Sequence, residues 1–224
     1  MIGRRGPARG SLVAVTSSSG SPAAAGRLTS RGAATRTRIV EAAADLMYVR
    51  GVNATTLDDV RIASGTSKSQ LYRHFEDKEA LVRAVVALRA QQVLERERGY
   101  LERFRSFSAL KRWRNALVER NALQNGAYGC VLGSLASELS AQDDEVRQTL
   151  WTHLADWEGL LAGGFRRMQE SGSLSADADP DKLAVGLMAS LQGGYLLAET
   201  AHDVAPMATA LDMALDHIHS FVID

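Results

Sequence analysis

The sequence predicts an all-α protein of about nine helices, and three observations support this fold class. Apolar residues recur at helical spacing through most of the chain from residue 35 onward. Helix-start residues precede these runs, and nothing between residues 35 and 88 resembles a strand. The composition is typical of a globular protein, with 46% hydrophobic and 23% charged residues. At 224 residues the chain can hold one or two domains with a sizeable core.

Composition also excludes several classes of protein. The single cysteine cannot form an internal disulfide, so a disulfide-stapled secreted scaffold is excluded. The longest run of low charge, Leu183 to Ala198, is shorter than the roughly 20 residues that span a membrane, and it is predicted to be a buried helix. The first residues have no apolar stretch beyond Leu12 to Val15 and do not resemble a secretory signal. We therefore expect a cytoplasmic protein without a membrane partner.

Residues 1–33 are expected to form a disordered basic arm. They are mainly Gly, Ser, Ala and Arg, with no acidic residue and little to bury. Two interpretations remain open: a passive tail or mis-assigned start, and an arm that contacts DNA phosphates.

Residues 34–83 carry the signals of three short helices and the start of a fourth. A turn at Ser64-Gly65 separates the second helix from the third, as in a helix-turn-helix, although many small helical bundles would share this spacing. The end signals are Thr35 and Gly51 around the first helix, Thr56 with Asp59 and Ser67 with Gln70 as capping boxes of the next two, and Asp77 before the fourth.

Residues 84–224 also show helical patterns and form the second predicted domain. The predicted helices cover 109–122, 131–139, 144–171, 180–201 after an Asp179 cap, and a last one from Pro206.

Several features of the first domain occur together and in order. They are Arg38-Ile39-Val40 with Ala42-Ala43, Gly51, Ala54-Thr55-Thr56, Gly65, Ser67-Lys68, Leu71-Tyr72, His74-Phe75 and Lys78-Glu79 with Leu81. Together they resemble the DNA-binding domain of the TetR family of transcriptional regulators. Met47, Val52 and Arg61 depart from the family pattern; Arg61 replaces a small residue, and its charged head is expected to reach the surface. Residues 129–139 and 191–194 resemble the branch that includes regulators of drug-efflux and flavonoid-responsive genes.

The resemblance implies that the helix beginning at Ser67 enters the major groove of a near-palindromic operator. Lys68 suits a phosphate or guanine, and Gln70 suits adenine. Leu71 and Phe75 are expected in the core, and for Tyr72 and His74 a packing role is the alternative to DNA contact. The predicted DNA-binding residues are Thr56, Ser67, Lys68, Ser69, Gln70, Tyr72, His74 and Lys78.

The resemblance also implies a repressor that a small hydrophobic ligand releases from DNA. Aromatic and polar residues of the second domain are candidates to line its pocket, with ordinary core packing as the alternative. The candidates are Trp113, Tyr128, Trp151, His153, Trp157, Phe165, Gln192 and Tyr195. The other functions considered are a helical small-molecule binder or enzyme that has lost DNA binding, and an architectural DNA binder without an effector.

No catalytic, metal or cofactor site is predicted. The chain has no Gly-rich phosphate loop and no HExxH motif, and His217 and His219 point apart on a helix. Cys130 is expected to be a small buried hydrophobic residue.

A homodimer is expected to form through the last two helices. Gly186, Ser190 and Gly194 would make a small-residue groove on the first of them. The last helix would offer Met207, Ala210, Leu211, Ala214 and Ile218, and intramolecular packing of both faces is the alternative.

The net charge of zero does not exclude DNA binding, because charge is unevenly distributed. Residues 1–33 carry 5 Lys and Arg and no acidic residue, residues 34–83 carry 8 against 7, and residues 84–224 carry 13 against 19. The acidic second domain is expected to suit neutral or cationic ligands better than anionic ones.

Overall fold

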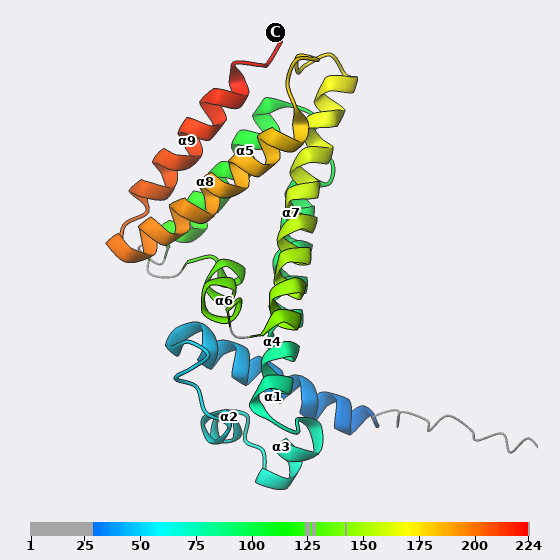
Figure 1. The fold of residues 1–224 in the computed structure, drawn as a ribbon, viewed down its shortest axis with the longest axis vertical. Coiled ribbons are helices and arrows are strands. Elements are labelled where there is room, and N and C mark those ends of the chain that lie inside the picture. The colour runs from blue at the N-terminus through cyan, green and yellow to red at the C-terminus, as the bar shows by residue number, and fades with distance from the viewer. Residues whose placement is uncertain (1–28, 124–125, 127–128, 142, 224) are drawn as a thin grey trace, which may run out of the picture.

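A computed structural model of the chain describes residues 29–123, 126, 129–141 and 143–223. Within these ranges it contains nine helices and no strand, apart from one isolated bridge between Leu174 and Val222 (Figure 1). The helices are α1 Ser30–Arg50, α2 Leu57–Ala63, α3 Lys68–His74, α4 Lys78–Leu101, α5 Phe107–Ala122, α6 Val131–Leu139, α7 Asp144–Glu170, α8 Pro180–Ala201 and α9 Ala205–His219. The all-α class is confirmed, and no described helix combines the length and apolarity needed to cross a bilayer.

The helix-start signals correctly place most of the helix beginnings. Thr56 and Ser67 each form a complete capping box, and Asp77 accepts a hydrogen bond from the Ala80 N–H. Gly51 ends α1 with a φ of 83°, a left-handed conformation that glycine adopts without strain.

The predicted start of the first helix is wrong. Helix α1 begins at Ser30, capped by Thr29, and Thr35 lies inside it with its hydroxyl donating to the Arg31 carbonyl. Residues 30–33 are therefore helical, and residues 1–28 of the predicted arm lie outside the described residues. A threonine is accommodated inside the helix here because its hydroxyl bonds back to a carbonyl of the preceding turn.

The boundary predicted after residue 83 falls inside α4, which runs without interruption from Lys78 to Leu101. Its first half packs on α1, and its second half packs on α7 (Figure 1). A continuous helix therefore joins the two halves of the molecule, where a linker would have left them independent.

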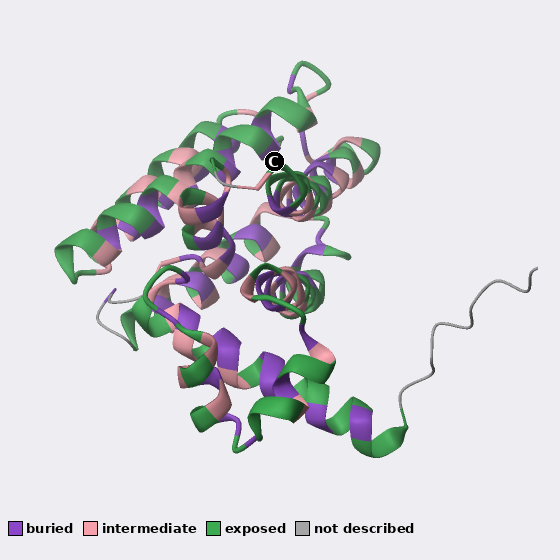
Figure 2. Cartoon of the chain, turned by 60° about the horizontal axis from the view of Figure 1, so that its bottom comes forward, coloured by how far each residue is buried: buried purple, intermediate pink, exposed green. Residues whose placement is uncertain are grey.

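A single hydrophobic cluster runs through both halves of the molecule. Buried residues line the inward faces of the helices, and exposed residues cover the outward faces (Figure 2). Close packing is most evident where α7 passes Phe104, because a Cβ on Gly164 would lie 1.8 Å from that ring. This approach allows the Phe104 and Phe165 rings to meet edge to face at 5.6 Å.

Helix α8 is buried on one face only, which corrects the prediction of a buried helix. Val185, Leu196 and Leu197 are each more than half exposed in the single chain. The predicted small-residue groove is also divided: Gly194 packs on Met207 of α9, whereas nothing lies within 4 Å of a Cβ at Gly186.

The residues predicted on α9 mostly face inward. Met207, Leu211 and Ile218 belong to the intramolecular core, and Ala210 and Ala214 are half-buried. The large apolar side chain that this helix exposes is Met213, at 71% exposure.

Candidate nucleic-acid interface and ligand cavity

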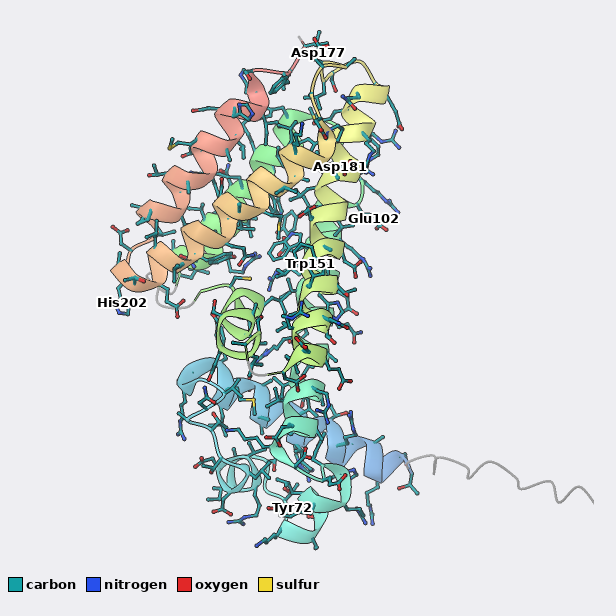
Figure 3. The ribbon with its side chains drawn as sticks, viewed as in Figure 1. Tyr72, Glu102, Trp151, Asp177, Asp181 and His202 are labelled. Carbon is teal, nitrogen blue, oxygen red and sulfur yellow. The ribbon has the colours of Figure 1, made fainter. Side chains whose placement is uncertain are left out.

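Helix α3 lies at the end of the molecule opposite the C-terminal helix, and Tyr72 marks its exposed face (Figure 3). Leu71 and Phe75 are buried in the core, as predicted, and hold the helix in place. The preceding turn is fixed by Gly65, with φ of 62°, and by Arg38 of α1, whose Nε donates to the Ser64 carbonyl at 2.9 Å. The exposed face therefore stands on a rigid support, as a reading helix requires.

The predicted DNA-binding residues differ in how freely they are presented. Ser67, Lys68, Ser69 and Tyr72 are exposed, and the Lys68 ammonium lies 6.0 Å from the centroid of the Tyr72 ring. This places a cation, two hydroxyls and a phenol on one continuous surface, where phosphate and base-edge contacts could be made together.

Three predicted residues are engaged in helix capping: Thr56, Ser67 and Gln70, with the Ser67 hydroxyl accepting the Gln70 N–H at 3.2 Å. The Thr56 hydroxyl bonds to Asp59, and the Gln70 side-chain carbonyl accepts the Ser67 N–H at 2.9 Å. Asp59 also has its pKa lowered, first by the Thr56 hydroxyl and then by the Thr56 backbone. The oxygen of Gln70 is thus already committed within the protein.

Lys78 and His74 are less accessible. The Lys78 ammonium donates to the Asn53 carbonyl at 3.3 Å. The Nε2 atom of His74 is buried without a hydrogen-bond partner, and burial, with added repulsion from Arg73 and Arg36, lowers the pKa of its ring. Contact of His74 with a phosphate would require the ring to turn.

Two arginines beside this surface were not among the predicted residues. Arg73 is exposed on α3, and Arg36 of α1 is exposed with its guanidinium 5.2 Å from the centroid of the Phe75 ring. Arg73 could have been found from its place next to Tyr72 on the reading helix, whereas only the packing of α1 brings Arg36 here. Arg61 bonds through Nε to Asp58 at 2.7 Å, so its head reaches the surface as predicted.

The second half of the molecule contains a cavity of about 250 Å³, here called the inner cavity. It lies among α1, α4, α5, α7 and α8 and the start of α6 with the segment that leads into it. Its lining residues are Tyr48, Arg89, Gln92, Val93, Arg96, Arg120, Asn121, Gly129, Cys130, Val131, Trp157 and Tyr195.

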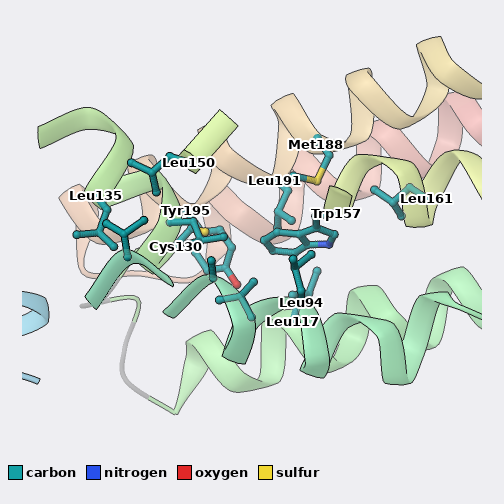
Figure 4. Packing of buried hydrophobic residues seen from close by; sticks show 14 of the residues in the cluster. Leu94, Leu117, Cys130, Leu135, Leu150, Trp157, Leu161, Met188, Leu191 and Tyr195 are labelled. Carbon is teal, nitrogen blue, oxygen red and sulfur yellow. The ribbon is translucent and has the colours of Figure 1, made fainter. Parts of the chain in front are cut away.

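A wider depression of about 590 Å³ between α6 and α8, here called the outer groove, shares Gly129, Cys130 and Tyr195 with the inner cavity. Cys130 and Tyr195 lie side by side, with Trp157 farther along the core (Figure 4). Burial raises the pKa of the Cys130 thiol and raises that of Tyr195 to about 12, so both groups are neutral at physiological pH.

Three of the predicted ligand residues line these spaces. Trp157 and Tyr195 line the inner cavity, and Gln192 and Tyr195 line the outer groove. The two spaces meet at Gly129 and Cys130, directly before α6, and at Tyr195 of α8.

The other predicted ligand residues lie elsewhere. Trp113 is buried and donates to Glu97, Phe165 packs on Phe104, and Trp151 is 66% exposed on α7 (Figure 3). His153 is half-buried 4.0 Å from Asp156, and Tyr128 is outside the described residues.

The arginines of the inner cavity were missed at the sequence level. Arg89 and Arg96 share a face of α4 with buried Val93, at spacings of four and three residues. Arginines four and three residues from a buried valine are a usable signal, but Arg120 joins them only through the packing of α5. Within the described ranges, no group of three His, Cys, Asp or Glu side chains could hold a metal ion.

Comparison with known proteins gives matches over both halves. Residues 39–85 match the family model for bacterial regulatory proteins of the tetR family, and residues 101–214 match the tetracyclin repressor-like C-terminal domain. The transcriptional regulator AcuR of Cereibacter sphaeroides is 28% identical over 192 residues, covering 82% of this chain and 80% of that protein. The transcriptional repressor DhaR of a Mycobacterium species is 28% identical over 188 residues, covering 81% and 90%.

Solved structures share the fold. The regulatory protein TetR from Rhodobacter sphaeroides superimposes with a TM-score of 0.74 at 22% identity, covering 84% of this chain and 99% of that one. A TetR transcriptional regulator from Chloroflexus aurantiacus gives a TM-score of 0.74 at 23% identity, covering 87% and 98%.

Proposed function

Because this chain belongs to the TetR family and is a DNA-binding transcriptional regulator, we propose that it is a dimeric repressor, released from a near-palindromic operator by a small ligand in the inner cavity. The observation that carries the proposal is the pairing of an exposed reading helix with a cavity in the same molecule. We assign the reading head to α1, α2, α3 and the start of α4, and the effector and dimer functions to the remainder. Its place of action would be the cytoplasm, where the operator lies.

The proposal assigns DNA contact to one surface of the head. Ser67, Lys68, Ser69 and Tyr72 would meet the DNA first, with Thr56, Gln70, His74 and Lys78 at its margins. Arg73 and Arg36 are added as phosphate contacts. One head reads only a few base pairs, so two heads spaced by about 34–36 Å are needed for adequate affinity.

The dimer would form through the outward faces of α8 and α9. Val185, Ala189 and Gly193 recur every four residues along the exposed side of α8, and Leu196 and Leu197 continue it. Exposed Met213 lies on the neighbouring α9. An apolar stripe of this length on a single chain is typical of an association surface.

Charge substitutions on this stripe test the dimer. We expect Leu197→Glu combined with Met213→Glu to give a monomer in sedimentation equilibrium, because each would bury a carboxylate at the interface. Val49→Glu, at an equally exposed valine of α1, is the matched control and should leave the dimer intact. A dimeric double variant would contradict the assignment.

Gel retardation with the DNA upstream of the chain's own gene tests repression. We expect a dimer to retard one segment at moderate salt, and Lys68→Ala with Tyr72→Ala to weaken it. Retardation of no segment would favour a small-molecule binder or enzyme that has lost DNA binding. The inner cavity argues against an architectural DNA binder, whose core would be filled at that place.

A further inference from the structure

The charge pattern of the inner cavity departs from that of the domain around it. Its lining includes three guanidinium groups, from Arg89, Arg96 and Arg120, and among the described residues no aspartate or glutamate. From this lining we infer that the effector is a small organic acid, with a carboxylate head held by these arginines and an apolar body. The inference rests on the proposed function only in taking the inner cavity as the effector site.

One buried carboxylate compensates part of this charge. Glu97 is fully buried and accepts hydrogen bonds from the Trp113 indole at 2.7 Å and from Arg96 Nε at 2.9 Å. Arg120 reaches the same carboxylate at 3.4 Å. A single negative charge is thus shared by two cations, which leaves an excess of positive charge at the cavity wall.

Arg89 has its carboxylate partner outside the cavity. Its NH2 group pairs with Asp45 at 2.7 Å, but the Asp45 side chain is 80% exposed, so solvent screens that pair. The Arg89 Nε is buried and makes no hydrogen bond within the part of the chain that the structure describes. This unused donor belongs to a cavity-lining residue and is a point at which an anionic group could be accepted.

The remaining lining sets the size and the nature of the ligand's body. Val93, Val131 and the Trp157 ring supply apolar surface, and Tyr195 supplies a neutral hydroxyl. The volume of about 250 Å³ lies below the roughly 300–1,000 Å³ typical of sites for drug-sized ligands. A short aliphatic or aromatic acid fits this description, and a nucleotide does not.

This inference reverses the expectation drawn from the charge of the whole second domain. Residues 84–224 are acidic in sum, which predicted neutral or cationic ligands. Most of those acidic side chains lie on the outside, where water screens them, whereas the arginines line a partly enclosed space in which charge acts more strongly.

Matched pairs of compounds test the inference directly. Benzoate and hexanoate are compared with benzamide and hexanamide by calorimetric titration of the full dimer, at constant ionic strength. We expect each acid to bind at least about tenfold more tightly than its amide, because only the acid pairs with guanidinium groups. Equal binding of acid and amide, or no saturable binding of either acid at millimolar concentration, would overturn the inference.

Arginine substitutions then locate the binding. Arg120→Gln removes a partner of buried Glu97 and can disturb folding, so Arg89→Gln, whose carboxylate partner is exposed, is the decisive variant. We expect Arg89→Gln to weaken benzoate binding at least about tenfold with an unchanged unfolding temperature. Arg147→Gln, at an exposed arginine paired with Asp144 on α7, is the control and should bind benzoate as the unchanged protein does. Benzoate binding unaffected by Arg89→Gln would contradict the site.

Three further measurements test the acid inference and the proposed function separately. Inorganic phosphate binding as tightly as benzoate would indicate a plain anion site and overturn the organic acid. Gel retardation by the ligand-free dimer tests repression alone: acid binding without retardation supports the cavity assignment while contradicting the repressor. Release from DNA by neutral compounds only would keep the repressor and overturn the acid.

Discussion

At the scale of single residues, the reading helix must satisfy its own backbone and still present groups to DNA. Gln70 illustrates the conflict, because its side-chain oxygen completes the capping box of α3 with the Ser67 N–H. The sequence predicted both roles for Gln70 but could not decide between them, since one pattern of residue types encodes both. Substitutions of Gln70 that keep the helix cap but alter the DNA contact can decide between the two roles.

Gln70→Glu is such a variant, because glutamate also completes a capping box. We expect its unfolding temperature to stay within a few degrees of the unchanged protein, while operator affinity falls at least about tenfold as a carboxylate meets the phosphates and base edges. Thermal unfolding and gel retardation measure the two effects. Gln70→Ala serves as the comparison, because it loses the cap as well and should also unfold at lower temperature. Full operator affinity in Gln70→Glu would limit the role of Gln70 to capping.

Cys130 offers a residue-scale probe of the cavities, because it is the chain's only cysteine and lines both of them. Burial holds the pKa of its thiol above the ordinary value of 9.0, so little thiolate is present near pH 8. We expect its reaction with a disulfide reagent to be at least about tenfold slower in the folded protein than in denaturant. The Cys130 thiol ionises at lower pH in the unfolded chain than in the folded protein. The free energy of unfolding should therefore fall as pH rises above about 9. Equally fast reaction in both states would contradict this burial.

At the scale of elements, α6 connects the outer groove with the reading head. Its Glu138 carboxylate accepts the Val52 N–H at 2.9 Å and the Asn53 N–H at 2.7 Å, both in the turn between α1 and α2. Gly133 and Ser137, on the same helix, line the outer groove, and Val131 at its start lines the inner cavity proposed for the effector. A ligand that displaces α6 would therefore move the turn that supports α2, which gives the two sites a physical connection.

Glu138→Gln tests that connection, because an amide oxygen is a weaker acceptor than a carboxylate and its nitrogen cannot accept an N–H. We expect a loss of about 1 kcal/mol in the free energy of unfolding, and weaker release of operator DNA by any effector that works on the unchanged protein. Denaturant unfolding and retardation with increasing effector measure these effects. Glu41→Gln, at an exposed carboxylate of α1, should change neither. Unchanged stability and release in Glu138→Gln would exclude α6 as the connection.

The helix ends could be predicted from the sequence, whereas the inner cavity could not. Caps and helix ends depend on neighbouring residues, so Thr56, Ser67, Asp77 and Asp179 could be identified directly. The inner cavity depends on how separate helices pack, and only packing brings Arg120 to Arg89 and Arg96. Trp113, Trp151 and Trp157 have similar helical contexts in the sequence. The structure buries two and exposes one, a difference that periodicity alone does not determine.

At the scale of the whole molecule, the zero net charge combines regions of opposite sign. The segment 34–83 is barely positive, so it gives only modest nonspecific attraction to DNA. Positive charge on the head is concentrated at Arg36, Lys68 and Arg73, while acidic groups of the second domain surround a cationic cavity. The local placement of charge, rather than the net charge, therefore determines the binding of both proposed ligands, operator DNA and the organic acid.

The basic segment before α1 provides the last test of this view. Residues 1–28 contain four arginines and no acidic residue, and deleting them leaves Thr29 to cap α1, whereas deletion to residue 30 would remove that cap. If these arginines neutralise phosphates, the logarithm of operator affinity should fall less steeply with the logarithm of salt concentration after deletion, by about 0.9 for each phosphate that is no longer neutralised. Replacing the four arginines by glutamine in the full-length chain is the matched control and should reproduce that slope. A slope unchanged by either alteration would exclude the segment from DNA binding and leave the affinity to the head alone.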